Sequence, residues 1–267
     1  MQPTTNNNHQ HADFYRSVLD TLSRAGVPFL VSGGFALEHF TGISRDIKDL
    51  DIFVLGTDIG AALGALGADG YRSELTFSHW LGKVYDHNDV DYVDLIFSSG
   101  NGLCKVDRVW FERAVRGEIF EMPVFLCPPE EMIWQKSFIM ERERYDGADV
   151  AHLILAQGDR LDWQRVLNLF GRHWRVFLSH LILFDYIYPA EKSKVPAFVR
   201  HKLLDLLSQE VCQPASASRV CRGSFLSRAQ FQVDIENWGY EDARLAHMSE
   251  EEVAQWSNAA NQKEDKP

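Results

Sequence analysis

The chain has 267 residues, of which 45% are hydrophobic and 24% charged, which is the composition of an ordinary globular protein with its own core. Its 27 Lys and Arg residues against 38 Asp and Glu residues give a net charge of −11, which repels a phosphate backbone and argues against long nucleic acid as a partner. The cysteines fit neither a zinc spacing nor a disulfide framework, so we expect a reducing, cytoplasmic location; they are Cys104, Cys127, Cys212 and Cys221.

The ends and the most apolar stretch give no sign of a membrane protein. Residues 1–11 lack the basic start and apolar run of a secretory signal, and we expect them to be a disordered lead-in. The stretch 176–188 is interrupted by His180 and Asp185 and is too short to cross a bilayer, so we expect no membrane association.

Helical patterns alternate with strand-like runs through the first half of the chain. Helical spacing of apolar residues occurs at 14–22, 35–40 and 61–66, and strand-like runs occur at 27–31, 50–55, 71–97 and 122–127. We therefore predict an α/β domain over residues 12–127, built as a mixed sheet flanked by helices.

Helical patterns dominate after Pro128-Pro129, a pair that is typical of a boundary. The predicted helices cover 131–144, 150–157, 163–170 (capped by Asp162), 172–188 and 195–209. We predict a helical domain over 128–211, an irregular extension over 212–256 that packs on it or borders an acceptor pocket, and a disordered tail over 257–267.

Ser32-Gly33-Gly34 follows the first strand-like run and opens a helix. Glycines there let an anion approach backbone N–H groups at the positive end of the helix dipole, and a Cβ at Gly34 would crowd that approach. The motif is compatible with a phosphate site and also with a plain turn.

Asp49-Leu50-Asp51 lies in an apolar run, and strand alternation puts both carboxylates on one face. Carboxylates in apolar surroundings are costly unless they are paired or bind metal, and Mg²⁺ prefers oxygen ligands. A third acid, Asp94, lies in the apolar run 92–97 and completes the cluster if the two strands are neighbours. Asp91, on the opposite strand face, is the competing candidate.

Together the Gly-Gly turn, Asp49-Leu50-Asp51 and the later strand aspartate resemble the polymerase-beta-like nucleotidyltransferase superfamily, which transfers a nucleotidyl group from a nucleoside triphosphate to an acceptor. The stretch 45–51 resembles the superfamily's small bacterial branches, which include aminoglycoside nucleotidyltransferases and abortive-infection-type toxins. The segments 129–136 and 144–153 are similar to the helical segment that follows the catalytic domain in those branches. The resemblance covers about residues 28–155.

The resemblance implies that Gly33 and Gly34 contact the triphosphate and that Asp49 and Asp51 hold Mg²⁺ or Mn²⁺. Asp94 would complete a second metal site and help to activate the acceptor hydroxyl. Many members of the superfamily carry Gly-Ser where this chain has Gly33-Gly34, and Ser32, which precedes the pair, is a candidate substitute.

Three cations are further candidates for binding the nucleotide. Arg45 and Lys48 flank the aspartate pair, with solvated loop cations as the alternative. Lys136 lies in an apolar helical segment, where its partner is either a phosphate or one of Asp146 and Asp149.

The expected activity is metal-dependent transfer of a nucleoside monophosphate from a nucleoside triphosphate to a hydroxyl group. The acidity favours a small molecule or a protein over long nucleic acid as the acceptor. The alternatives are a non-catalytic nucleotide sensor or antitoxin-like protein, and a toxin that modifies tRNA.

Overall fold

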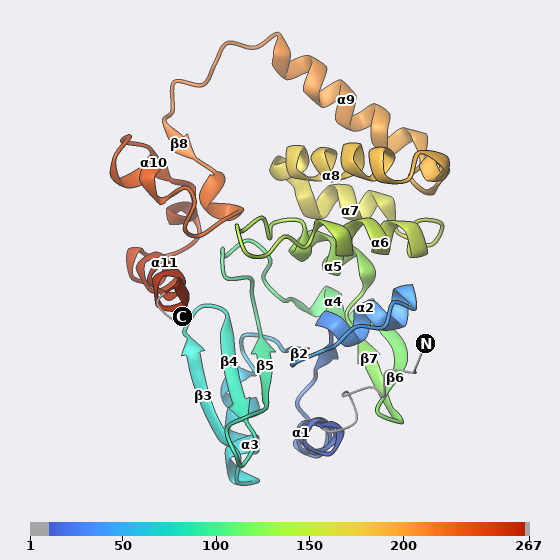
Figure 1. Cartoon of the computed structure of the whole chain (residues 1–267), viewed down its shortest axis with the longest axis vertical. Coiled ribbons are helices and arrows are strands. Elements are labelled where there is room, and N and C mark those ends of the chain that lie inside the picture. Colours follow the sequence, from blue (N-terminus) through green and yellow to red (C-terminus); the bar gives the residue numbers. More distant parts are fainter. Residues whose placement is uncertain (1–10, 265–267) are drawn as a thin grey trace. The chain divides into compact units, whose positions relative to one another are not determined.

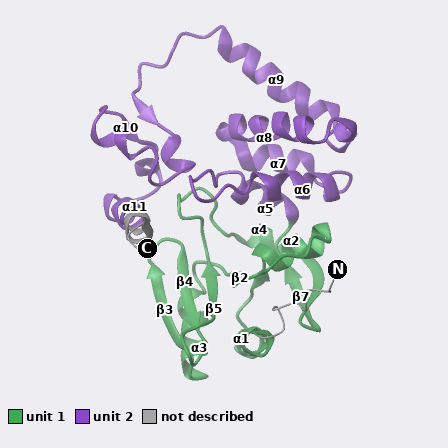
Figure 2. Cartoon of the chain, viewed as in Figure 1, with its two compact units in different colours: residues 1–128 green, residues 129–267 purple. Residues whose placement is uncertain are grey.

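The computed structural model describes residues 11–264; residues 1–10 of the expected lead-in 1–11 and the last residues 265–267 lie outside this range. Two compact units divide the chain, residues 1–128 (unit 1) and residues 129–267 (unit 2), as Figure 2 shows. The division falls between Pro128 and Pro129. No helix in the described part of the chain combines the length and apolarity that a membrane crossing needs.

Unit 1 contains a mixed sheet of seven strands among the described residues, in the order β3-β4-β5-β2-β1-β7-β6 (Figure 1). Its strands are β1 (Leu30–Val31), β2 (Leu50–Phe53), β3 (Arg72–Phe77), β4 (Leu81–Tyr85), β5 (Tyr92–Ile96), β6 (Val115–Ile119) and β7 (Met122–Leu126). The pairs β2–β5 and β1–β7 are parallel, and the other neighbours are antiparallel. The predicted mixed sheet is confirmed.

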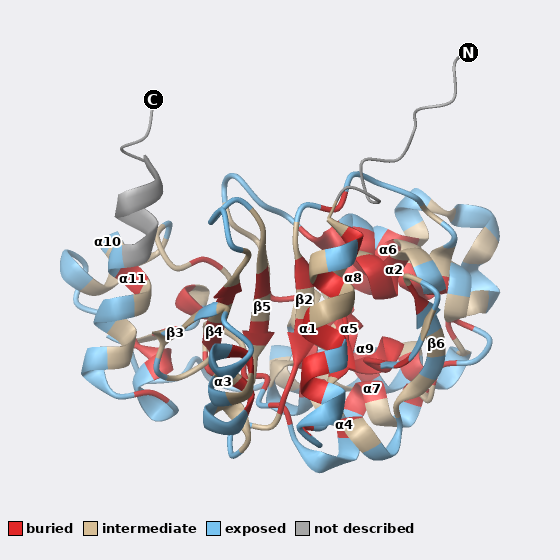
Figure 3. Cartoon of the chain, turned by 90° about the horizontal axis from the view of Figure 1, so that it is seen from below, coloured by how far each residue is buried: buried red, intermediate tan, exposed pale blue. Residues whose placement is uncertain are grey.

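Helices flank this sheet, as predicted: α1 (Ala12–Arg24), α2 (Gly33–Thr41) and α3 (Ile59–Ala68). A further short helix, α4 (Arg108–Glu112), was not predicted. Helix α1 packs on α3, α3 on β3 and β4, and α2 on β2. The buried face of α1 carries Tyr15, Val18, Leu19 and Leu22, which recur at helical spacing. Buried segments of β2 and β5 are red in Figure 3, and these two strands lie in the interior of the sheet rather than at its edges.

Unit 2 is mainly helical. Its elements are α5 (Pro129–Lys136), α6 (Gly147–Gln157), α7 (Trp163–Phe170), α8 (Trp174–Ile187), α9 (Ala197–Val211), β8 (Val220–Cys221), α10 (Gln232–Glu236), β9 (Glu241–Asp242) and α11 (Glu250–Glu264), with short 3-10 segments at Gly171–His173, Pro189–Lys194, Gly223–Phe225 and Ala243–Ala246. Asp162 caps α7 as predicted, because its side chain accepts a hydrogen bond from the Arg165 backbone N–H.

Further segments differ from the sequence-based expectation. The helix predicted for 131–144 ends at Lys136, and the chain then turns back through a bridge between Met140 and Tyr145. Strand β6 was not predicted, because its sequence VRGEI has no run of apolar residues. Helix α11 continues through Glu264, over most of the polar tail for which we expected disorder.

Candidate functional site

Asp51 on β2 and Asp94 on β5 are direct partners in a parallel strand pair. Their neighbours Leu50 and Val93 are also partners and are fully buried on the other side of the strands. Because side chains alternate along a strand, the two aspartates share the opposite face, and Asp49 joins them two positions earlier. One carboxylate oxygen from each of Asp49, Asp51 and Asp94 lies within 4.8 Å of the others. The predicted convergence of the three acids is therefore present.

Gly33 brings the start of helix α2 against the Asp51 carboxylate. Its φ of +59° is strained for any other residue, and an added Cβ would lie 1.8 Å from Asp51 Oδ2. The backbone N–H of the buried Ser32 donates to the Asp51 carbonyl oxygen at 2.9 Å, which ties the turn to β2. The expected crowding at Gly34 is corrected: its Cβ would meet the Ile47 side chain at 2.9 Å, so the position that admits no side chain beside the acids is Gly33.

Lys83 and Tyr92 also belong to the site, and the sequence reasoning missed both. Lys83 on β4 is the cross-strand partner of Asp94 and donates a hydrogen bond from Nζ to Asp94 Oδ1 at 2.5 Å. The same ammonium lies 3.9 Å from the centre of the Tyr92 ring. The Tyr92 hydroxyl donates to Asp49 Oδ2 at 3.4 Å, and burial together with the Asp49 charge raises the pKa of Tyr92 to about 12. A lone lysine between Gly82 and Val84 in a short strand was the available signal.

Asp91, the competing candidate, lies outside this group. Its Oδ2 is 2.5 Å from Nδ1 of His11, so it forms a separate pair. The pKa of the nearby Tyr15 is raised, mainly by burial and secondly by the negative charge of Asp91. The Tyr15 hydroxyl donates to the Lys48 carbonyl oxygen at 3.3 Å, which holds the loop before β2 against α1.

The three candidate cations lie in different surroundings. Arg45 and Lys48 are exposed on the loop between α2 and β2. Lys136 belongs to unit 2 and donates to Asp146 at 2.9 Å and Asp149 at 2.7 Å, which is one of the two kinds of partner that the sequence left open. A phosphate-binding role for these cations stays a prediction.

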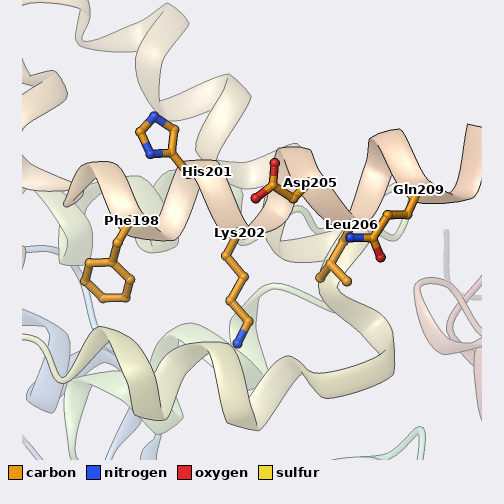
Figure 4. Close-up of a pocket in the computed structure, with 6 residues that line it drawn as sticks. All are labelled: Phe198, His201, Lys202, Asp205, Leu206 and Gln209. Carbon is orange, nitrogen blue, oxygen red and sulfur yellow. The ribbon is translucent and has the colours of Figure 1, made fainter.

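A surface hollow on unit 2 is separate from the acids. Figure 4 shows its lining, which comes from α9 and consists of Phe198, His201, Lys202, Asp205, Leu206 and Gln209. None of the predicted site residues contributes to it.

The donor set of the site suits a hard divalent cation. Three carboxylates offer oxygen ligands within 4.8 Å of one another, and all three side chains are partly open to solvent. Oxygen donors in this number are what Mg²⁺ and Mn²⁺ accept. The helix start at Gly33 adds backbone N–H groups and a positive dipole end beside Asp51, an arrangement that would stabilise an anion.

No family model and no curated protein matches the chain. Similar solved structures include the lincosamide antibiotic adenylyltransferase LnuA in its lincomycin-bound form, with 17% identity over 53% of this chain and 94% of that chain and a TM-score of 0.38. The antibiotic-resistance factor ANT(2'')-Ia has 15% identity over 67% of this chain and 98% of that chain, with a TM-score of 0.43. A nucleotidyltransferase-like protein from Paracoccidioides brasiliensis has 15% identity over 66% and 93% of the two chains and a TM-score of 0.35.

Proposed function

We propose that this protein is a metal-dependent nucleotidyltransferase that transfers a nucleoside monophosphate from a nucleoside triphosphate to an acceptor hydroxyl group. The observation that carries the proposal is the convergence of Asp49, Asp51 and Asp94 within 4.8 Å, with the start of helix α2 packed against Asp51 at Gly33. The Asp51 carboxylate takes the place that a Cβ on Gly33 would fill. If the three acids had only a structural role, this close approach of the helix start to Asp51 would add no stability.

In this proposal Asp49, Asp51 and Asp94 would hold Mg²⁺ or Mn²⁺, which neutralises charge on the phosphates and on the attacking oxygen. The backbone N–H groups at Gly33 and Gly34 bind phosphate oxygens, and Ser32 fixes the turn through its hydrogen bond to β2. A carboxylate oxygen of Asp94 accepts the proton of the acceptor hydroxyl. The acceptor oxygen then bonds to the α-phosphorus, the bond from that phosphorus to the diphosphate breaks, and diphosphate leaves.

Arg45 and Lys48, on the loop before β2, are proposed to supply positive charge to the triphosphate. The net charge of −11 favours a small molecule or protein as acceptor rather than long nucleic acid, and the absence of a disulfide pattern favours the cytoplasm.

The test measures transfer of label from α-labelled nucleoside triphosphates in the presence of Mg²⁺ or Mn²⁺, with each of the four bases. The acceptor panel contains lincomycin, an aminoglycoside of the kind that the family resemblance implies, and pools of protein and RNA. Asp49→Asn is the inactive reference, and Asp46→Asn, an exposed aspartate in the same loop, is the matched control. Metal-dependent triphosphate binding without transfer to any acceptor would favour the nucleotide sensor instead.

A further inference from the structure

We propose that Lys83 is a counter-ion of the site. Its ammonium group forms an ion pair with Asp94 in the metal-free protein and competes with metal for that carboxylate. The inference rests on the proposed function, because it assumes that Asp49, Asp51 and Asp94 bind a divalent cation. Lys83 thereby acts as a positioning residue, which acts on the reaction through Asp94.

The geometry of the Lys83–Asp94 pair makes it a strong interaction. The two residues face each other across the antiparallel strands β4 and β5, and Lys83 Nζ lies 2.5 Å from Asp94 Oδ1. Their side chains are only 20% and 14% exposed, so water screens the pair weakly. A metal that takes Asp94 as a ligand must therefore break a charge-assisted hydrogen bond.

Electrostatics explains why a cation belongs there. Three carboxylates within 4.8 Å of one another repel strongly where the solvent is partly excluded. The ammonium of Lys83 relieves that repulsion at Asp94, whereas Asp49 receives only a long hydrogen bond of 3.4 Å from the uncharged Tyr92 hydroxyl. Asp49 consequently keeps more attraction for a cation than Asp94 does.

Lys83 has a second contact that it can keep when it leaves Asp94. While its Nζ bonds to Asp94, it also lies 3.9 Å from the centre of the Tyr92 ring, whose negative face attracts a cation. A small rotation of the lysine side chain can release the carboxylate while the ammonium stays over the ring. Binding of metal at Asp94 is then an exchange of cations, and it is favoured once a triphosphate has brought further negative charge to the site.

The experiment measures Mn²⁺ binding to the full chain without nucleotide, by calorimetry and by the electron paramagnetic resonance signal of free Mn²⁺. Lys83→Met, which keeps the side-chain length without the charge, should bind Mn²⁺ about tenfold more tightly than the wild type. Asp94→Asn should change the wild-type affinity by less than about twofold, because Asp94 is occupied by Lys83. In the Lys83→Met background, Asp94→Asn should weaken binding by about tenfold.

Two controls separate competition at Asp94 from a general change of charge. Lys105→Met removes the same charge at an exposed position and should leave the affinity as in the wild type. Lys83→Arg keeps the charge and should also behave as the wild type does. Circular dichroism checks that each variant is folded, and the comparison of wild type with Asp94→Asn needs no change at Lys83.

The inference is overturned if Lys83→Met binds Mn²⁺ no more tightly than the wild type, or if Asp94→Asn weakens binding equally in both backgrounds. Asp49→Asn tests the underlying metal site by itself, and it should reduce Mn²⁺ binding whether or not Lys83 competes. Unchanged binding in Asp49→Asn would remove the proposed metal site, and with it the role of Lys83.

Discussion

Gly33 and Asp51 are in such close contact that no side chain fits between them: a Cβ on Gly33 would lie 1.8 Å from Asp51 Oδ2 and 2.7 Å from its Cγ. The φ of +59° at Gly33 is an additional reason for glycine there. The two requirements can be separated, because Gly26 has a φ of +67° with nothing within 4 Å of its Cβ position.

Gly33→Ala and Gly26→Ala should therefore differ in function while sharing a similar backbone strain. Each should lose about 1 kcal/mol of stability from the left-handed backbone alone. Only Gly33→Ala should push the Asp51 carboxylate aside, and it should lose Mg²⁺-dependent triphosphate affinity as well. Calorimetry with a non-hydrolysable triphosphate measures this, and equal affinities in the two variants would show that Gly33 has a structural role only.

Asp51→Asn should lower triphosphate affinity in Mg²⁺ and reduce transfer by about three orders of magnitude, because it removes one negative ligand with almost no change of shape. Calorimetric titration with a non-hydrolysable triphosphate measures the affinity. In EDTA the variant and the wild type should have similar affinities, since the lost interaction is with the metal. Asp46→Asn, on the exposed loop before β2, is the matched control. Magnesium-linked binding that survives in Asp51→Asn would mean that the aspartate pair is structural.

Lys136→Met should destabilise unit 2 by about 3 kcal/mol, because it removes a cation from Asp146 and Asp149, which are only 9% and 7% exposed. Adding Asp149→Asn should recover part of that loss, since one of the two buried negative charges that lost the lysine is then gone. Urea denaturation measures both effects. A loss of triphosphate affinity in folded Lys136→Met, measured far below the unfolding midpoint, is the result expected if this lysine also contacts a phosphate.

A decrease in pH should destabilise the protein, because His173 resists protonation in the folded state. Its ring packs edge-on against Phe138 and Phe225, and burial, followed by the charge of Arg172, lowers its pKa from 6.5 to about 4. The unfolded chain binds a proton near pH 6.5 while the folded chain does not, so stability is complete above pH 6.5 and falls as the pH decreases toward 4. His173→Phe should lose less stability than the wild type between pH 7 and pH 5 in denaturant titrations. His201→Phe, at an exposed position, should keep the wild-type dependence.

The alternation of apolar and acidic residues was enough to predict the central part of the site. In 49–53 and 92–96 the buried positions Leu50, Ile52 and Leu95 fix which face each strand turns inward, and the aspartates follow on the other face. The further condition, that the two strands are neighbours in parallel register, is a property of the sheet and entered the prediction only as an assumption.

The residues that the sequence did not reveal act through non-local contacts. The sequence around Lys83 does not mark it as a site residue. It lies beside the acids only because β4 pairs with β5, which places Lys83 opposite Asp94. The turn after Lys136 was also hidden, since the apolar residues Phe138, Ile139 and Met140 continue a helical pattern. There the tertiary pairing of Lys136 with Asp146 and Asp149 accompanies the reversal of the chain.

The position of β2 and β5 inside the sheet affects how fast the backbone amide hydrogens of the site exchange with solvent. Each strand is hydrogen-bonded on both sides, β2 to β1 and β5, and β5 to β2 and β4. The amide hydrogens around Asp51 and Asp94 can therefore exchange with solvent deuterium only through an opening that breaks several ladders together, whereas those of the exposed loop 43–46 can exchange through local fluctuations. We therefore expect the backbone amides of Asp51 and Asp94 to exchange among the slowest in unit 1, and those of the loop before β2 to exchange fast.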